Sequence, residues 1–128
     1  MADNSIDTSK KVAVDFLQLV VAGRIDEAYD KYVDMTGRHH NPFFPAGFAS
    51  LKKAMAENES QCPNKRLDVA HVLADGDMVA VHSHLTFGQG QPDMTVVHLF
   101  RFAGGKVVEM WDVAQQIPQD SPNKDGAI

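Results

Sequence analysis

The spacing of apolar residues changes near residue 60, and this change constrains the fold more than any other feature of the sequence. In the first sixty residues apolar side chains recur every three or four positions, which predicts amphipathic helices. From about residue 65 onward they follow the period of two that is typical of strands. The predicted strands are 66–74, 78–87, 94–102 and 106–115. Helices followed by strands predict a single α+β domain.

Three helices are expected before residue 60, covering the sheet. The first runs from the capping segment 7–9 to Gly23, the second covers 25–33, and the third covers about 47–58. Prolines make the stretch from Met35 to Pro45 irregular in this prediction. The ordered core is expected to span about residues 8–118 of one domain that covers residues 1–128, between flexible polar termini.

Two short turns, at Asp75-Gly76 and Gly104-Gly105, join the predicted strands as hairpins, so we expect a curved antiparallel sheet. Few strand positions on either face are strongly polar. A sheet that is apolar on both faces has to cover both, so one face is expected to meet the helices and the other a second subunit. The sequence therefore predicts a homodimer.

Composition excludes several classes of protein. The net charge is -5 with a pI near 5.6, and the basic residues are scattered, which argues against a nucleic-acid partner. No apolar run approaches the ~20 residues that a membrane span needs. The polar N-terminus lacks a signal core, and a lone Cys62 suits a reducing compartment. We expect a soluble cytoplasmic domain without a membrane partner.

Six histidines are many for a chain of 128 residues. Because side chains alternate along a strand, His82 and His84 share one face of their strand, and His98 shares a face with Phe100 and Phe102. The His82/His84 pair resembles a metal site, but the nearest acidic residue that follows is Asp93. We therefore expect no bound metal, and a metal-dependent enzyme using His82, His84 and His98 is an alternative.

The register beyond the Gly104-Gly105 turn decides which of two neighbouring residues faces the same way as His98. A plain two-residue turn would place Trp111 opposite His98 and turn Asp112 away. A bulge or a longer loop would shift the register by one residue and exchange the two faces. The sequence leaves both registers open.

Several segments together resemble the SnoaL-like polyketide cyclase family, which belongs to the nuclear transport factor 2-like superfamily. The similar segments are His40-Asn41-Pro42, then 79–84, 99–102 and 105–113. The resemblance implies a cone, or cystatin-like roll, in which a curved sheet wraps three helices around a deep pocket. It also implies acid–base chemistry without metal or cofactor, and it carries roles over to Asp112 and His40. Met110 and His98 depart from the family pattern, where His and Asp are common.

These observations favour a lyase or isomerase of the polyketide-cyclase type that acts on a small carbonyl compound in an apolar pocket. Buried carboxyl and imidazole groups have pKa values near neutrality and exchange protons at pH 7. Asp112 or His98 is expected to act as the base, assisted by His40 or His82. The expected pocket wall consists of Phe16, Tyr29, Tyr32, Phe44, Phe100 and Trp111. A homodimeric module that binds a small ligand without turnover is the other alternative.

Overall fold

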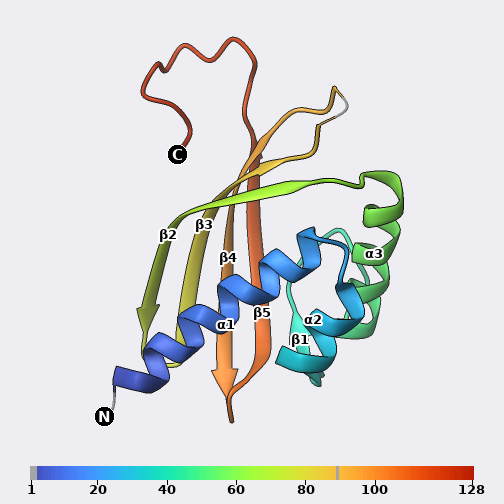
Figure 1. Cartoon of the computed structure of the whole chain (residues 1–128), viewed down its shortest axis with the longest axis vertical. Coiled ribbons are helices and arrows are strands. Elements are labelled where there is room, and N and C mark those ends of the chain that lie inside the picture. The colour runs from blue at the N-terminus through green and yellow to red at the C-terminus, as the bar shows by residue number, and fades with distance from the viewer. Residues whose placement is uncertain (1–2, 89) are drawn as a thin grey trace.

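The computed structural model describes residues 3–88 and 90–128 (Figure 1). These residues contain three helices and five strands. Helices α1, α2 and α3 lie to one side of a single curved sheet (Figure 1). The helices are α1 (Asp3–Val21), α2 (Ile25–Tyr32) and α3 (Phe48–Gln61). The strands are β1 (Val33–His39), β2 (Arg66–Asp75), β3 (Met78–Thr86), β4 (Met94–Ala103) and β5 (Lys106–Gln116). The predicted α+β class is confirmed.

The sheet has the strand order β1-β5-β4-β3-β2. Strands β2 to β5 pair with their neighbours in antiparallel fashion, as the sequence predicts, but β1 pairs with β5 in parallel, so the sheet is mixed. The expectation of an irregular stretch from Met35 was wrong for residues 35–39. This strand pairs with a segment about seventy residues away, and Gly37 interrupts its apolar pattern, so no local signal marks it.

Helix α1 begins earlier than expected. It starts at Asp3, so the segment 7–9 lies within the helix and is not its cap. No glycine or proline interrupts residues 3–21, so nothing in the chain ends the helix there until Gly23, whose backbone has a positive φ. The described part of the chain holds no helix that is long and apolar enough to cross a membrane.

Aliphatic and aromatic side chains fill the space between the helices and the inner face of the sheet, which is the face that α1 crosses (Figure 1). Phe16 of α1 meets Tyr29 of α2 edge to face at 5.2 Å between ring centroids, and Phe100 of β4 at 5.9 Å. All three side chains are buried. Edge-to-face packing of this kind adds about 1 kcal/mol per pair to the free energy of burial.

β-Bulges in β2 and β5 curve the sheet. One extra residue, Ala70, lies between the pairs Val69–Ser83 and His71–His82, and Val108 is extra in β5. A bulge bends its strand and increases the local twist, and β2 bends strongly across the top of α1 in Figure 1. Gly37 accommodates the second bulge, because a Cβ atom there would lie 2.2 Å from the carbonyl oxygen of Val108.

Candidate active site

A cavity of about 210 Å³ lies between the C-terminal half of α1, the end of α3 and the inner face of the sheet. Its wall is mostly apolar, with four polar side chains. The polar ones are Asn58, Lys65, His98 and Asp112. The apolar ones are Leu17, Val20, Val21, Met55, Leu67, Leu85, Phe87, Met94, Val96 and Ala114. A mostly apolar cavity with a few converging polar groups is typical of small-molecule binding.

The bulge at Val108 brings the two titratable groups of the sheet wall together. Phe102 pairs with Val107, as a two-residue turn predicts, but Arg101 then pairs with Glu109. From this point the register is shifted by one residue, and His98 pairs with Asp112. Both side chains line the cavity. The shift that the sequence left open therefore occurs, although it arises two residue pairs beyond the turn.

His98 has no hydrogen-bond partner for its buried Nδ1 atom. Burial lowers the pKa of His98 to about 4, and the charge of nearby Asp112 offsets part of that effect. The ring is therefore neutral at pH 7. A buried polar atom without a partner costs about 1–3 kcal/mol. Because the His98 ring also lines the cavity, it can contact a bound molecule.

Asp112 is held from the segment that follows β1. The side-chain Nδ2 of Asn41 donates a hydrogen bond to Oδ2 of Asp112 over 3.0 Å. Tyr29 also lies close to this carboxylate. Burial, followed by the charge of Asp112, raises the pKa of the Tyr29 hydroxyl, which therefore stays protonated.

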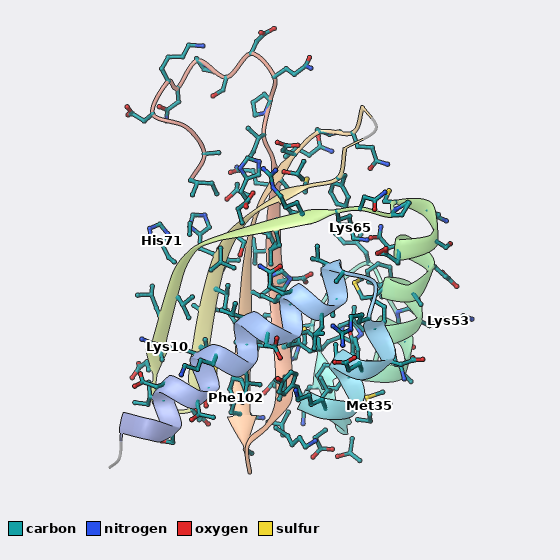
Figure 2. All side chains as sticks on the ribbon, viewed as in Figure 1. Lys10, Met35, Lys53, Lys65, His71 and Phe102 are labelled. Atoms are coloured by element: carbon teal, nitrogen blue, oxygen red, sulfur yellow. The ribbon has the colours of Figure 1, made fainter. Side chains whose placement is uncertain are left out.

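An ion pair closes the other end of the cavity, where α3 leads into β2. Lys65, labelled in Figure 2, is largely buried there and bonds Oε2 of Glu59 and the carbonyl oxygen of Cys62, each over 3.0 Å. The ammonium group is thus neutralised by the protein itself. The wall nearest to this end therefore suits an uncharged molecule.

The expected aromatic wall is part of the core or of the surface. Phe16, Tyr29 and Phe100 are buried in the aromatic core and do not line the cavity. The hydroxyl of Tyr32 on α2 donates a hydrogen bond to Asp15 on α1, outside the cavity. Phe44 is partly exposed in the segment between β1 and α3. The wall of this cavity comes mostly from aliphatic residues of α1 and the sheet.

His40 and Trp111 lie on the outer face of the sheet, away from the helices. Their rings stack at 5.0 Å between centroids, and Nε2 of His40 lies 2.6 Å from Oε2 of Glu109. Glu109 also accepts two hydrogen bonds from Arg101. The hydrogen bond with His40 is the largest cause that lowers the pKa of the Glu109 carboxyl group, and the bonds from Arg101 are the next. This cluster does not reach the cavity.

His82 is also an outer-face residue. Its Nδ1 lies 3.0 Å from Nδ1 of His71, and its Nε2 lies 3.0 Å from the hydroxyl of Thr95. Figure 2 labels His71 on the curved part of β2. His84 bonds Asp93 over 2.8 Å. Because His82 and His84 face away from His98, these three histidines do not converge on one metal ion. Residues 3–88 and 90–128 contain no group of three or more His, Cys, Asp or Glu residues that could hold one.

The geometry therefore brings together His98 and Asp112 from the expected set and separates them from His40 and His82. Asn41 is not among the predicted site residues, although it belongs to the His40-Asn41-Pro42 motif. A neutral imidazole donates or accepts a hydrogen bond, and a carboxylate accepts a proton. Side by side in an apolar cavity, the two groups are equipped for proton transfer to and from a bound molecule.

Comparison with known proteins agrees with this architecture. The family model of the SnoaL-like domain matches residues 13–110. No curated protein matches the chain. Similar solved structures include TsrD from Streptomyces laurentii (TM-score 0.72, 17% identity, 84% of this chain and 88% of that one). An NTF-2 like protein of unknown function from Burkholderia xenovorans LB400 gives a TM-score of 0.71 at 16% identity, over 91% and 88%. A SnoaL-like polyketide cyclase from Agrobacterium tumefaciens gives 0.67 at 15% identity, over 84% and 91%.

Proposed function

The chain belongs to the SnoaL-like domain family, and on that premise we propose that it is an acid–base enzyme acting on a small carbonyl compound without a cofactor. The observation that carries this proposal is the pair His98 and Asp112 on one wall of the cavity. The imidazole lines the cavity, where it can contact a substrate, and its buried nitrogen has no protein partner. The polyketide cyclases among the similar structures supply an analogy for the reaction class only.

In the proposed reaction the carboxylate of Asp112 removes a proton from the carbon next to the carbonyl group. The electrons of that C–H bond form the enolate, and the charge moves to the carbonyl oxygen. The neutral ring of His98 donates a hydrogen bond to this oxygen from a ring N–H. Protonated Asp112 then returns its proton to another carbon, which gives an isomer, or to the oxygen formed when the enolate attacks a second carbonyl group, which gives ring closure.

The apolar wall contributes by keeping water away from the developing charge. Hydrogen bonds to an enolate oxygen are stronger in such surroundings than in water. The low pKa of His98 suits this role, because a neutral imidazole donates its proton in a hydrogen bond without transferring it. The neutralised Lys65 at the far end favours substrates without a charged group at that position.

The proposal is tested with 2-tetralone, a two-ring ketone with acidic α-protons, in deuterium oxide. We expect wild-type protein to accelerate the exchange of these protons, followed by proton NMR. Asp112→Asn should lower the catalysed rate by about 10²-fold, because a positioned base contributes about that much. Asp68→Asn removes an exposed carboxylate that pairs with Arg66 and should leave the rate unchanged.

Two results would contradict the proposal. Equal exchange rates for wild type and Asp112→Asn would exclude Asp112 as the base. Binding of 2-tetralone to the cavity without any exchange above the buffer rate would favour the alternative, a module that binds a small ligand without turnover.

We also propose that the outer face of the sheet pairs with a second copy of the chain. Leu73 of β2 and Val113 of β5 are 67% and 70% exposed there, and Val113 shares its face of β5 with the stacked Trp111. Apolar area of this kind usually marks an interface. Light scattering should give about twice the chain mass of 14.1 kDa, and Val113→Glu should reduce it to the single-chain value. A single-chain mass for the wild type at micromolar concentration would refute the dimer.

A further inference from the structure

One hydrogen bond connects the cavity to the segment between β1 and α3. It runs from Nδ2 of Asn41 to Oδ2 of Asp112, over 3.0 Å, and spans 71 positions of sequence. Among the described residues, Asn41 is the only one whose side chain donates a hydrogen bond to this carboxylate. The other oxygen of Asp112 is thus left without a side-chain donor and is available to a substrate proton.

The orientation of the Asn41 amide is fixed by a second bond. The backbone N–H of Phe43 donates to Oδ1 of Asn41 over 2.9 Å, so this atom is the oxygen and the one facing Asp112 is the NH₂ group. Turning the amide over would set its oxygen against the carboxylate and its NH₂ group against an N–H donor. Both bonds would be lost together, so the donor stays directed at Asp112.

His39 holds the backbone of this segment in place. Its Nδ1 accepts a hydrogen bond from the backbone N–H of Asn41 over 3.1 Å, so its proton lies on Nε2. That nitrogen donates to the carbonyl oxygen of Pro45 over 2.8 Å. The ring is buried against Phe48 at the start of α3. A neutral, buried imidazole thus ties the two ends of the turn to each other.

The strand pairing of β1 explains why this turn meets Asp112. His39 pairs with Met110, and the backbone N–H of His40 donates to the carbonyl oxygen of Met110 over 2.9 Å. The chain then leaves the sheet edge beside the part of β5 that carries Asp112. Because Pro42 follows, Asn41 is biased toward an extended backbone.

From these contacts we infer that Asn41 is a positioning residue for Asp112, held by the His39 clamp, which keeps one carboxylate oxygen bonded and presents the other to the substrate. This inference rests on the proposed function. A hydrogen bond to an ionised acceptor favours the ionised form, and it also fixes the direction of the free oxygen. Asn41 therefore supports Asp112 as a base without touching the substrate.

The test compares two replacements of similar size with a control from the same turn. Asn41→Leu removes the donor, and Asn41→Asp replaces it with a second carboxyl group. Phe43→Ala shortens a side chain that is 86% exposed and keeps the backbone N–H that bonds Asn41. Exchange of the α-protons of 2-tetralone in deuterium oxide is measured for each variant between pH 4 and 9, after circular dichroism has established that the variant is folded.

In Asn41→Leu we expect kcat to fall by about tenfold with KM unchanged, and the acid limb of the pH profile to move up by about one unit, since a hydrogen bond to a charged group contributes that much. Asn41→Asp should move the limb further, because two adjacent carboxyl groups share a proton. Phe43→Ala should match the wild type. A purely structural role would instead lower the folded fraction and leave the pH profile unchanged.

A second measurement needs no substrate. The side-chain NH₂ signals of Asn41 in a ¹⁵N spectrum should move in Asp112→Leu, which removes the acceptor, while those of Asn58, on the opposite wall, should not. The inference would be overturned if Asn41→Leu kept the wild-type kcat and pH profile. It would also be overturned if the Asn41 NH₂ signals did not move in Asp112→Leu. Failure of Asp112→Asn to slow exchange would instead overturn the proposed function, so the two failures are distinguishable.

Discussion

Histidines on the two faces of the sheet differ in their hydrogen bonding. On the outer face His71 and His82 bond each other, His84 bonds Asp93, and His40 bonds Glu109. On the inner face His98 has a buried nitrogen without a partner, beside Asp112. The large number of histidines therefore does not identify the site. The feature that identifies it is the one imidazole on the covered face whose bonding capacity the protein leaves unused.

The difference has a physical reason. An outer-face histidine that loses its partner can bond water instead, so its pairing contributes little to the free energy of unfolding. An inner-face histidine has no such substitute, and leaving its nitrogen unbonded lowers stability. Groups that break the local rules of packing in this way are concentrated at functional sites. The following three predictions test whether the two faces differ as described.

The largest expected effect compares neighbours on β4 that point to opposite faces. Phe100→Ala empties the aromatic core and should lower the free energy of unfolding by about 3–5 kcal/mol. Leu99→Ala, on the outer face and only partly buried, should cost about 1 kcal/mol. Urea unfolding below the concentration at which copies associate measures both. Equal costs would show that the two faces are equally packed within one chain.

The next effect is a pH dependence that comes from His98. Burial lowers its pKa from 6.5 to about 4, so in this window the unfolded chain binds a proton that the folded chain does not. The free energy of unfolding should therefore fall as the pH drops from 6.5 to 4, by at most about 3 kcal/mol. The contribution is fully present above pH 6.5.

Replacing the ring isolates this contribution. His98→Phe should flatten the dependence of stability on pH between 6.5 and 4, measured by urea unfolding at several pH values. His71→Gln, a matched change on the outer face, should retain the contribution of His98. The same pH dependence in His98→Phe and in the wild type would contradict the assignment.

A smaller effect tests the bulge that turns Asp112 inward. Gly37→Ala places a Cβ atom 2.2 Å from the Val108 carbonyl oxygen, and the backbone has to move. We expect a loss of about 1–3 kcal/mol, typical of overpacking. Gly76→Asn is the control, since a Cβ atom at that position would meet nothing within 4 Å and asparagine tolerates the backbone conformation there. Wild-type stability in Gly37→Ala would show that the bulge does not depend on this close approach.

Local patterns in the sequence were sufficient to predict the three helices and the four antiparallel strands, because apolar periodicity reports directly on the buried face of each element. They were insufficient for β1. Its partner, β5, is far away in the sequence. Glycine is required at position 37 by the close approach of the Val108 carbonyl oxygen, not by the local pattern of its own strand. A strand that pairs in parallel with a distant segment has no hairpin turn beside it in the sequence, and β1 also shows little alternation of apolar and polar residues.

The candidate site was predictable only in part for the same reason. Alternation placed His98 on the same face as Phe100, but the face of Asp112 depended on a bulge that β1 supports. The sequence resemblance includes the motif His40-Asn41-Pro42 and carries the role in the site over to His40. Adjacent side chains point in different directions, so once β1 is in place it is Asn41 that reaches Asp112.

The decisive experiment is an NMR titration of the His98 ring, assigned by comparison with His98→Phe. In the proposed enzyme this imidazole lines the cavity, is neutral, and donates a hydrogen bond to a substrate oxygen, while its buried Nδ1 has no protein partner. The Cε1–H signal of His98 should therefore not titrate until the pH falls to about 4. Titration near 6.5, the value of a solvated histidine, would mean that the ring is charged or exposed in the range where the enzyme works, and it would contradict the role assigned to His98.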